Sequence, residues 1–261
     1  MVISLKACPA FGFLVTRAER IVFRPFSMYY FSVLLFMLLI IFPIMMRFYR
    51  GIMVEALGLP PWMFEAVLFL SLFGSSVNIP LTSIESREPV KVYQEIRFFG
   101  VTWRIPRVEI GVRKTHVMLN LGGGVVPLLI SGYLLFVGIP RCSTDILSSY
   151  IDGLLVFILV MLSTYRSSRL IKGLGIATPM LGPPTATVLS VILLSVFRTV
   201  SCPTQIAYIG GTLGALVGAD LLNLNRITDL GAPVVSIGGA GSFDGIYLTG
   251  LFSVALVLLL V

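Results

Sequence analysis

Apolar stretches of about 20 residues recur along this chain and constrain its fold more than any other feature. A helix of that length is what crosses the hydrocarbon core of a bilayer. Within lipid the backbone must satisfy its own hydrogen bonds, which leaves only helices or closed barrels. Leu251–Val261 is continuously apolar and lacks the alternation of barrel strands. The sequence therefore predicts an all-α polytopic integral membrane protein, with the lipid bilayer as its surroundings.

Composition excludes an ordinary soluble domain. Hydrophobic residues make up 57% of the 261 positions, charged residues 12%, and the mean hydropathy is +0.99. A soluble domain of this size needs far more polar surface. The net charge of +7 is distributed among short segments beside the apolar runs, so we attribute it to membrane orientation and expect no nucleic-acid partner.

We predict about seven membrane-spanning helices in a single membrane domain covering residues 1–261. The first span is expected to act as an uncleaved targeting signal, because Arg17, Arg20 and Arg24 interrupt the segment before it. The expected spans are 29–46, 61–79, 117–138, 151–165, 185–197, 204–223 and 241–261.

Two connections have unusual composition. Residues 80–116 are polar yet rich in β-branched and aromatic residues on both sides of Gly100, which predicts a small β-hairpin-like cytoplasmic insertion. Gly173–Pro184 packs glycines and prolines into an apolar stretch before the fifth span. Irregular backbone is tolerated at membrane depth only where it is buried in protein or lines a wet cavity. We therefore expect a broken or re-entrant fifth span there.

Basic residues give the orientation. With the N-terminus in the cytoplasm, 15 Lys and Arg fall in inner segments and 4 in outer segments. Cytoplasmic loops carry the excess of Lys and Arg in membrane proteins. We therefore expect a multi-pass protein of the plasma membrane, with its N-terminus inside and its C-terminus outside.

The cysteines fit this orientation. Cys142 and Cys202 fall in two outer loops, on the side of the membrane where disulfides persist, and we predict that they are bonded; the alternative is two free thiols. His116 is the single histidine and no closely spaced cysteine pair exists. We therefore expect no metal and no other cofactor.

Four acidic residues fall inside the expected spans, where ionisable groups are costly and often functional. Glu65 and Asp152 lie near an outer boundary, within reach of water or headgroups. Asp220 and Asp244 lie at the inner ends of the sixth and seventh spans, among small residues that permit close helix approach. For Asp244, capping of its own helix is an alternative role.

Amide side chains and helix breakers gather at the same inner ends. The amides are Asn78, Asn120 and Asn223, and the breakers include Gly173–Pro184. This placement predicts one polar cavity that opens to the cytoplasm, with tight packing of small residues as the alternative.

Five segments carry a resemblance to a known family. They resemble the uncharacterised prokaryotic membrane-protein family catalogued as domain of unknown function 1614, over most of the chain after the first span. The resemblance implies a multi-span membrane protein and supplies no activity. The segments are Phe73–Pro80, Asn120–Pro127, Gly173–Pro184, Tyr208–Asn223 and Gly231–Gly250.

Gly218-Ala-Asp220 and Gly239–Asp244 are also similar to the glycine–aspartate motif of presenilin-type intramembrane aspartyl proteases, which use two membrane aspartates. The chain departs from that motif, because Ser242 stands where it has aspartate and no Pro-Ala-Leu follows.

Three functions are compatible with these features, and whether the protein is an enzyme stays open. The first is a transporter- or permease-like protein that binds a small cation, a proton or a polar solute through Asp220, Asp244 and the three asparagines. The second is an intramembrane aspartyl protease that uses the two aspartates as an acid/base pair. The third is a non-catalytic scaffold that docks partners through residues 80–116.

Overall fold

The computed structural model describes residues 28–98, 101–171, 175–230, 234–239 and 244–260, and it divides into two compact units, 1–46 and 47–261. Helix α1 (Met28–Arg50) fills the described part of the first unit and continues into a π-helical segment, η1 (Gly51–Ala56). Large apolar side chains are exposed along this helix, from Tyr29 to Phe48. A helix that is apolar on every side is stable only in apolar surroundings such as lipid.

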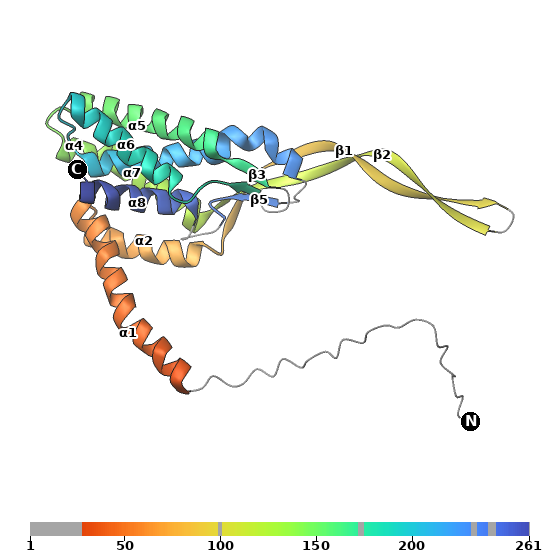
Figure 1. Ribbon diagram of the computed structural model, residues 1–261, viewed down its shortest axis with the longest axis horizontal. Helices are drawn as coiled ribbons and strands as arrows, with labels where there is room; N and C mark the ends of the chain where they lie inside the picture. Colours follow the sequence, from red (N-terminus) through yellow and green to blue (C-terminus); the bar gives the residue numbers. More distant parts are fainter. Residues whose placement is uncertain (1–27, 99–100, 172–174, 231–233, 240–243, 261) are drawn as a thin grey trace. The chain divides into compact units, whose positions relative to one another are not determined.

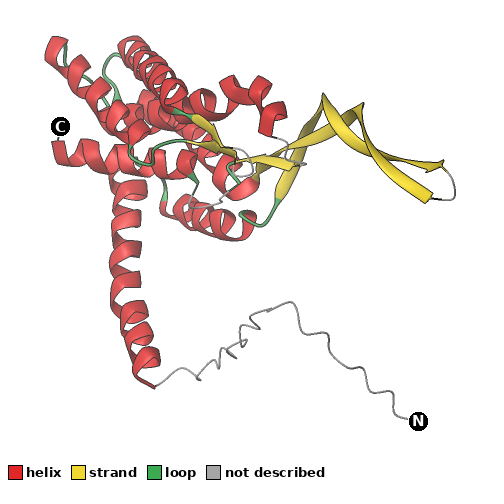
Figure 2. Ribbon diagram, turned by 45° about the vertical axis from the view of Figure 1, so that its right-hand side comes forward, coloured by secondary structure: helices red, strands yellow, loops and turns green. Residues whose placement is uncertain are grey.

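The second unit is a bundle of helices (Figures 1 and 2). Several of its helices include π-helical or 3₁₀ segments, labelled η. In chain order the helical elements are α2 (Pro61–Gly74), η2 (Leu121–Val125), α3 (Val126–Tyr133), η3 (Leu134–Gly138), α4 (Ile139–Cys142), α5 (Ile146–Ser167), α6 (Gly182–Phe197), α7 (Pro203–Ala215), η4 (Leu216–Asp220), η5 (Leu221–Leu230) and α8 (Gly245–Leu260).

Among the described residues, four helices are long and apolar enough to cross a membrane: Tyr29–Ala56, Leu121–Cys142, Ile146–Ser167 and Pro203–Arg226. Three further apolar helices, α2, α6 and α8, are 14, 16 and 16 residues long. At 1.5 Å per residue these three extend roughly 20 to 25 Å, which is less than the hydrocarbon core of roughly 30 Å. Each of the seven expected spans thus overlaps one apolar helix.

Several helix boundaries differ from the sequence expectation. The first helix does not stop at Met46 but runs on to Ala56, so Arg47 and Arg50 lie within it. The expected second span ends early, at Gly74, and the third helix starts late, at Leu121. Residues 78–79 and 117–120 are strands instead, because residues 78–82 pair with 117–120 and so satisfy backbone groups across a sheet.

A long two-stranded ribbon replaces the small hairpin that the sequence predicted. Strands β1 (Asn78–Phe98) and β2 (Val101–Asn120) pair antiparallel from Asn78↔Asn120 to Phe98↔Val101. At its base, β5 (Val234–Ile237) pairs parallel with His116–Leu119, which gives the strand order β1-β2-β5 (strands labelled in Figure 1). The protein is therefore mostly helical, and the β structure expected between residues 80 and 116 is present but larger than expected, because the strands extend to Asn78 and Asn120 and β5 joins them.

In its described part before α6, residues 175–181, the glycine- and proline-rich segment is not helical. Strands β3 (Arg169–Ile171) and β4 (Gly175–Ala177) form a small antiparallel sheet, and a turn follows up to Leu181. Helix α6 then begins at Gly182, with Pro183 in its first turn, where a missing backbone N–H costs nothing. An interruption ahead of the fifth expected span is thus present; its depth in a membrane stays a prediction.

Helix α7 lies at the centre of the bundle, against α5 on one side and α8 on the other. A Cβ at Gly210 would lie 2.6 Å from Val156 Cγ1, and one at Gly214 would lie 2.8 Å from Val160 Cβ. Only glycine therefore allows α5 and α7 to approach this closely, as is common between helices in membranes.

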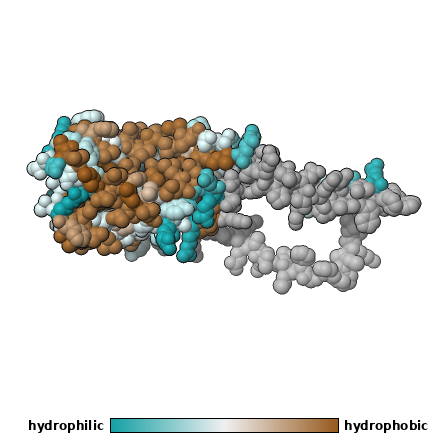
Figure 3. Space-filling model, turned by 90° about the horizontal axis from the view of Figure 1, so that it is seen from above, coloured by the Kyte–Doolittle hydropathy of each residue, from teal (hydrophilic) through white to brown (hydrophobic). Residues whose placement is uncertain are grey.

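Cys142 and Cys202 form a disulfide, as the sequence predicted, with their Cα atoms 5.8 Å apart. The bond joins the end of α4 to the residue before α7 and so links two of the long apolar helices. On the outside of the helices a broad apolar surface separates hydrophilic residues at its two ends (Figure 3). This banded surface is typical of a protein surrounded by lipid.

Candidate functional site

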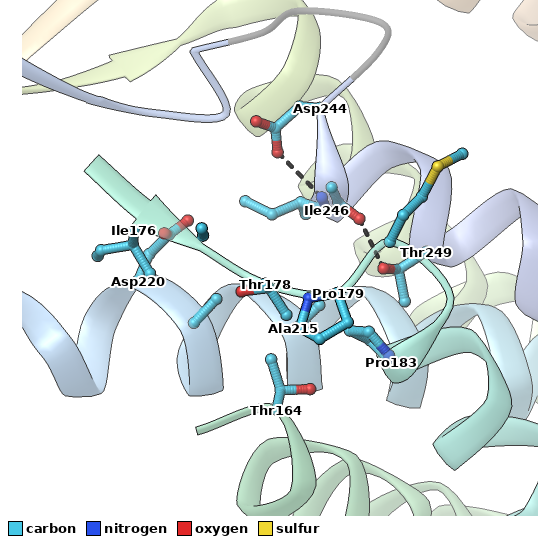
Figure 4. A pocket seen from close by; sticks show the side chains of 14 residues that line it. Thr164, Ile176, Thr178, Pro179, Pro183, Ala215, Asp220, Asp244, Ile246 and Thr249 are labelled. Atoms are coloured by element: carbon cyan, nitrogen blue, oxygen red, sulfur yellow. Dashed lines mark hydrogen bonds between the residues drawn. The ribbon is translucent and has the colours of Figure 1, made fainter. Parts of the chain in front are cut away.

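A pocket of about 240 Å³ lies where the helices of the bundle meet the small β3–β4 sheet (Figure 4). Parts of the chain that are far apart in sequence contribute to it: the end of α5, the segment from β4 to the start of α6, the end of α7 with η4, and the start of α8. We call it the aspartate pocket. Its lining residues are Thr164, Ile176, Ala177, Thr178, Pro179, Met180, Pro183, Ala215, Ala219, Asp220, Asp244, Gly245, Ile246 and Thr249.

Asp220 is the last residue of η4 and is half-buried. Within the described parts of the chain, its carboxylate forms no hydrogen bond and no ion pair. A carboxylate removed from water is normally paired with a cation or with several hydrogen-bond donors. Such a carboxyl takes up a proton, contacts water or binds a cation or donor from outside the described residues, and Asp220 can do so in this pocket, which it lines.

Asp244 immediately precedes α8 and lines the same pocket. One of its carboxylate oxygens, Oδ2, accepts a hydrogen bond from the backbone N–H of Ile246 at 2.9 Å, so the capping role considered above is realised (Figure 4). Capping does not remove this side chain from the pocket, since Asp244 remains one of its lining residues. The carboxylates of Asp220 and Asp244 are also close enough for their charges to interact.

Thr164 contributes a third polar group that sequence reasoning did not single out. The residue lies in the last turn of α5 and only 1% of it is exposed. Its Oγ1 has no hydrogen-bond partner in the residues that the structure describes. Four other buried hydroxyls of the described residues also lack a partner, and Thr164 differs from them in lining the pocket; the four are those of Ser131, Tyr208, Thr212 and Ser253. A threonine near the end of an apolar run gives no signal of this in the sequence.

The other two hydroxyls of the pocket have partners. Thr178 shares a hydrogen bond of 2.9 Å with Ser168, and Thr249 donates one of 2.6 Å to the carbonyl of Gly245. These bonds hold the β4–α6 connection against α5 and stabilise the first turn of α8. They therefore fix the pocket walls.

Asn78 and Asn120 lie outside the pocket, at the base of the β1–β2 ribbon. Asn120 is fully buried and donates to the carbonyl of Ser75 at 2.8 Å and to Asn78 Oδ1 at 3.2 Å. Its own Oδ1 accepts from Gly123 N at 2.9 Å and so caps the helix that starts at Leu121. Asn78 Oδ1 also accepts from Ser236 at 2.6 Å. Both amides thus hold the strands to the helices.

Asn223 is likewise buried and lies outside the pocket lining. Its Nδ2 donates to the carbonyls of Gly218 and Ala219, at 3.3 and 2.8 Å. Carbonyls near a helix end lack intrahelical partners, and the amide satisfies two of them. Of the five expected binding residues, the structure brings together the two aspartates in one pocket and gives the three asparagines contacts elsewhere.

The two remaining acidic residues of the expected spans differ from each other. Glu65 is exposed, in line with the expectation that it reaches the surroundings. Asp152 was expected to reach water or headgroups and does not, since only 1% of it is exposed. It forms an ion pair with Arg198, which follows α6. The position of Asp152 near the end of its own helix did not reveal Arg198, because that cation comes from the residue after a neighbouring helix, α6.

Comparisons with known proteins identify a family. No curated protein and no solved structure matched the chain. The family model described as "Protein of unknown function (DUF1614)" matches residues 72–256. This region is well over half of the chain and includes Thr164, Asp220 and Asp244 together with every other element that lines the pocket. The protein is thus a member of the family of unknown function DUF1614.

Proposed function

We propose that this protein is a transporter- or permease-like membrane protein whose aspartate pocket binds a positively charged species. One observation carries the proposal: Asp220 is half-buried in a pocket wall and has no counter-ion or donor among the described residues. A second carboxylate, Asp244, adds negative charge to the same pocket. Ionisable residues within membrane helices are expensive and mark pathways for ions and substrates.

We further propose that all seven apolar helices cross the plasma membrane, the three short ones together with the segments that adjoin them. The charge distribution then places the N-terminus and the β1–β2 ribbon in the cytoplasm and the Cys142–Cys202 disulfide outside. The aspartate pocket would open to the cytoplasm, since it adjoins the same ends of the helices as the strands. A two-stranded ribbon has unpaired backbone edges, which supports its location in water.

The test is cation flux in liposomes that contain the purified full-length protein. Uptake of sodium, potassium, protons and methylammonium would be followed under an imposed membrane potential. We expect flux of at least one of these cations, and its loss in Asp220→Asn, which removes the charge and keeps the shape. Glu65→Gln is the matched control, because it makes the same change at an exposed carboxylate. Flux that Asp220→Asn leaves unaltered would contradict the role of this carboxylate.

A second candidate function is intramembrane proteolysis by an aspartate pair. The observation in its favour is that both carboxylates line one pocket and their charges interact. Two neighbouring carboxylates tend to share a single proton, which makes one an acid and the other a base toward a bound water. Cleavage of a membrane-helix reporter, abolished by Asp220→Asn and by Asp244→Asn, would support it. Cleavage that survives either substitution would exclude it.

A further inference from the structure

We infer that the aspartate pocket selects a small organic ammonium, a primary amine with a short apolar body, over an inorganic cation. The inference rests on the proposed function, since it names the class of ligand for the same pocket. Three features of the pocket carry it: the arrangement of acceptors, the apolar walls and the volume.

The acceptors come from three different elements. Thr164 Oγ1 belongs to α5, the carboxylate of Asp220 to η4, and that of Asp244 to the residue before α8 (Figure 4). A primary ammonium has three N–H donors and no acceptor. The Thr164 hydroxyl is buried and without a partner in the described chain, and an ammonium in the pocket beside it would supply the missing donor. The unpaired carboxylate of Asp220 would supply the counter-charge.

The rest of the pocket wall is apolar. Pro179, Met180 and Pro183 come from the β4–α6 connection, and Ala215 and Ile246 come from α7 and α8. A pocket with apolar walls and a few convergent polar groups is typical of sites for small organic molecules. These side chains offer a bare cation no oxygen ligands, whereas they would contact the carbon chain of an amine.

The volume agrees with this ligand class. A pocket of about 240 Å³ is several times the roughly 30 Å³ that one water occupies, so a bare ion would leave most of it filled with solvent. Calcium requires roughly six to eight oxygen ligands. In the described ranges of the chain no three His, Cys, Asp or Glu side chains are grouped to hold a metal ion. An alkylammonium fills the space and uses the acceptors that are present.

The experiment is a ligand titration of the purified full-length protein in detergent, read by calorimetry and by thermal stability. The ligands are methyl-, ethyl-, propyl-, butyl- and hexylammonium chloride, with sodium chloride, potassium chloride and butanol at matched concentrations. We expect affinity to rise with chain length and to fall once the chain exceeds the pocket. Asp220→Asn should weaken ammonium binding at least about thirtyfold, because it removes the charge partner.

Variants of Thr164 test whether binding depends on this hydroxyl as well as on the negative charge of the pocket. Thr164→Val, which keeps the shape and removes the hydroxyl, should weaken ammonium binding roughly fivefold. Thr164→Ser, which keeps the hydroxyl, should retain the affinity even if both variants are somewhat less stable. Glu65→Gln should bind like the unmodified protein.

The outcomes distinguish the inference from the function on which it rests. Ammonium binding no stronger than that of sodium or butanol, or binding that Asp220→Asn and Thr164→Val leave unchanged, overturns the inference. If sodium or potassium stabilises the protein through Asp220 while the amines do not, the cation site stands and the ligand class is wrong. If no cation binds through Asp220, both proposals fail.

Discussion

Two aspartates in the apolar helices of this protein have different surroundings, and the difference separates a structural residue from a candidate site. Asp152 is buried on α5 and forms an ion pair with Arg198, beside the hydroxyl of Ser148. Asp220 is half-buried and has no such partner within the described residues. A buried charge that loses its partner is strongly destabilising, whereas a charge without a partner has no such contact to lose.

The same substitution at these two positions should therefore affect stability differently. We expect Asp152→Asn to lower the free energy of unfolding by roughly 1 to 2 kcal/mol, because the charged hydrogen bond to Arg198 is lost while the exposed part of Arg198 remains solvated. Asp220→Asn should leave it unchanged or raise it. Equilibrium unfolding in mixed micelles, monitored by circular dichroism, measures both. Equal losses in the two variants would mean that Asp220 has a partner in the folded protein.

The sequence was sufficient to choose Asp220 and Asp244, because charge in an apolar run is rare and the topology put both residues at one membrane side. It misplaced Asn78, Asn120 and Asn223, since an amide beside a helix break can serve the backbone as well as a ligand. Thr164 gave no signal, because a hydroxyl is neither expensive nor rare in an apolar helix. Pocket residues differ from these asparagines in the side chains that face them from other elements, and the local sequence does not show those neighbours.

At the scale of helices and strands, close packing of α5 against α7 and η4 forms one wall of the pocket. Gly218 lies in η4, and a Cβ there would collide with the carbonyl oxygen of Met161 and lie 3.0 Å from Thr164 Cβ. Gly153 lies in α5 with nothing within 4 Å of the corresponding position. Glycine at Gly218 thus positions Thr164 relative to Asp220.

Gly218→Ala should therefore push α5 and η4 apart and impair the pocket more than the fold. We expect a loss of roughly 1 to 3 kcal/mol in unfolding free energy, as for overpacked cores, together with weaker cation binding. Gly153→Ala is the control and should be neutral or stabilising, because alanine favours a helix by up to about 1 kcal/mol over glycine. Thermal unfolding with and without ligand gives both quantities. Equal behaviour of the two variants would contradict the close approach.

The helices were predictable from apolar run length, but their ends were not. Residues 117–120 are apolar enough to continue a span, and they are strand because Asn78–Thr82 and β5 offer them backbone partners. Pairing between segments more than 100 residues apart, as between β2 and β5, leaves no local trace in the sequence. The ribbon was therefore recognised as β structure, while its length was underestimated.

At the scale of the whole molecule, seven apolar helices and a family match over residues 72–256 agree with the class of protein that the sequence predicted. Four of these helices are long enough to span a membrane by themselves. Of the short ones, α2 is followed by a turn and α6 is preceded by one, so the number of crossings depends on how such connections lie in the membrane. Orientation follows only from the basic residues.

Single cysteines test the orientation. In a background with Cys8→Ser, we expect Thr144→Cys to react with a membrane-impermeant maleimide in intact cells, and Tyr93→Cys to react only after permeabilisation. Both positions are exposed, and the native disulfide leaves no other free thiol. Thr144 adjoins the outer bridge and Tyr93 lies on the ribbon, so each is the control for the other. The reverse labelling pattern would show that the protein has the opposite orientation in the membrane.

The β1–β2 ribbon is a long extension from the helices, paired from Asn78↔Asn120 to Phe98↔Val101. At roughly 3.3 Å per residue, its paired strands extend about 65 Å, around twice the thickness of the hydrocarbon core. In the orientation proposed above, the far end of the ribbon would lie well beyond the headgroups, where soluble proteins diffuse. The base of this ribbon is bonded to β5, which precedes Asp244 by only a few residues. A partner that binds the far end of the ribbon could therefore displace its base. The base is paired with β5, and the chain continues from β5 to Asp244 in the pocket wall.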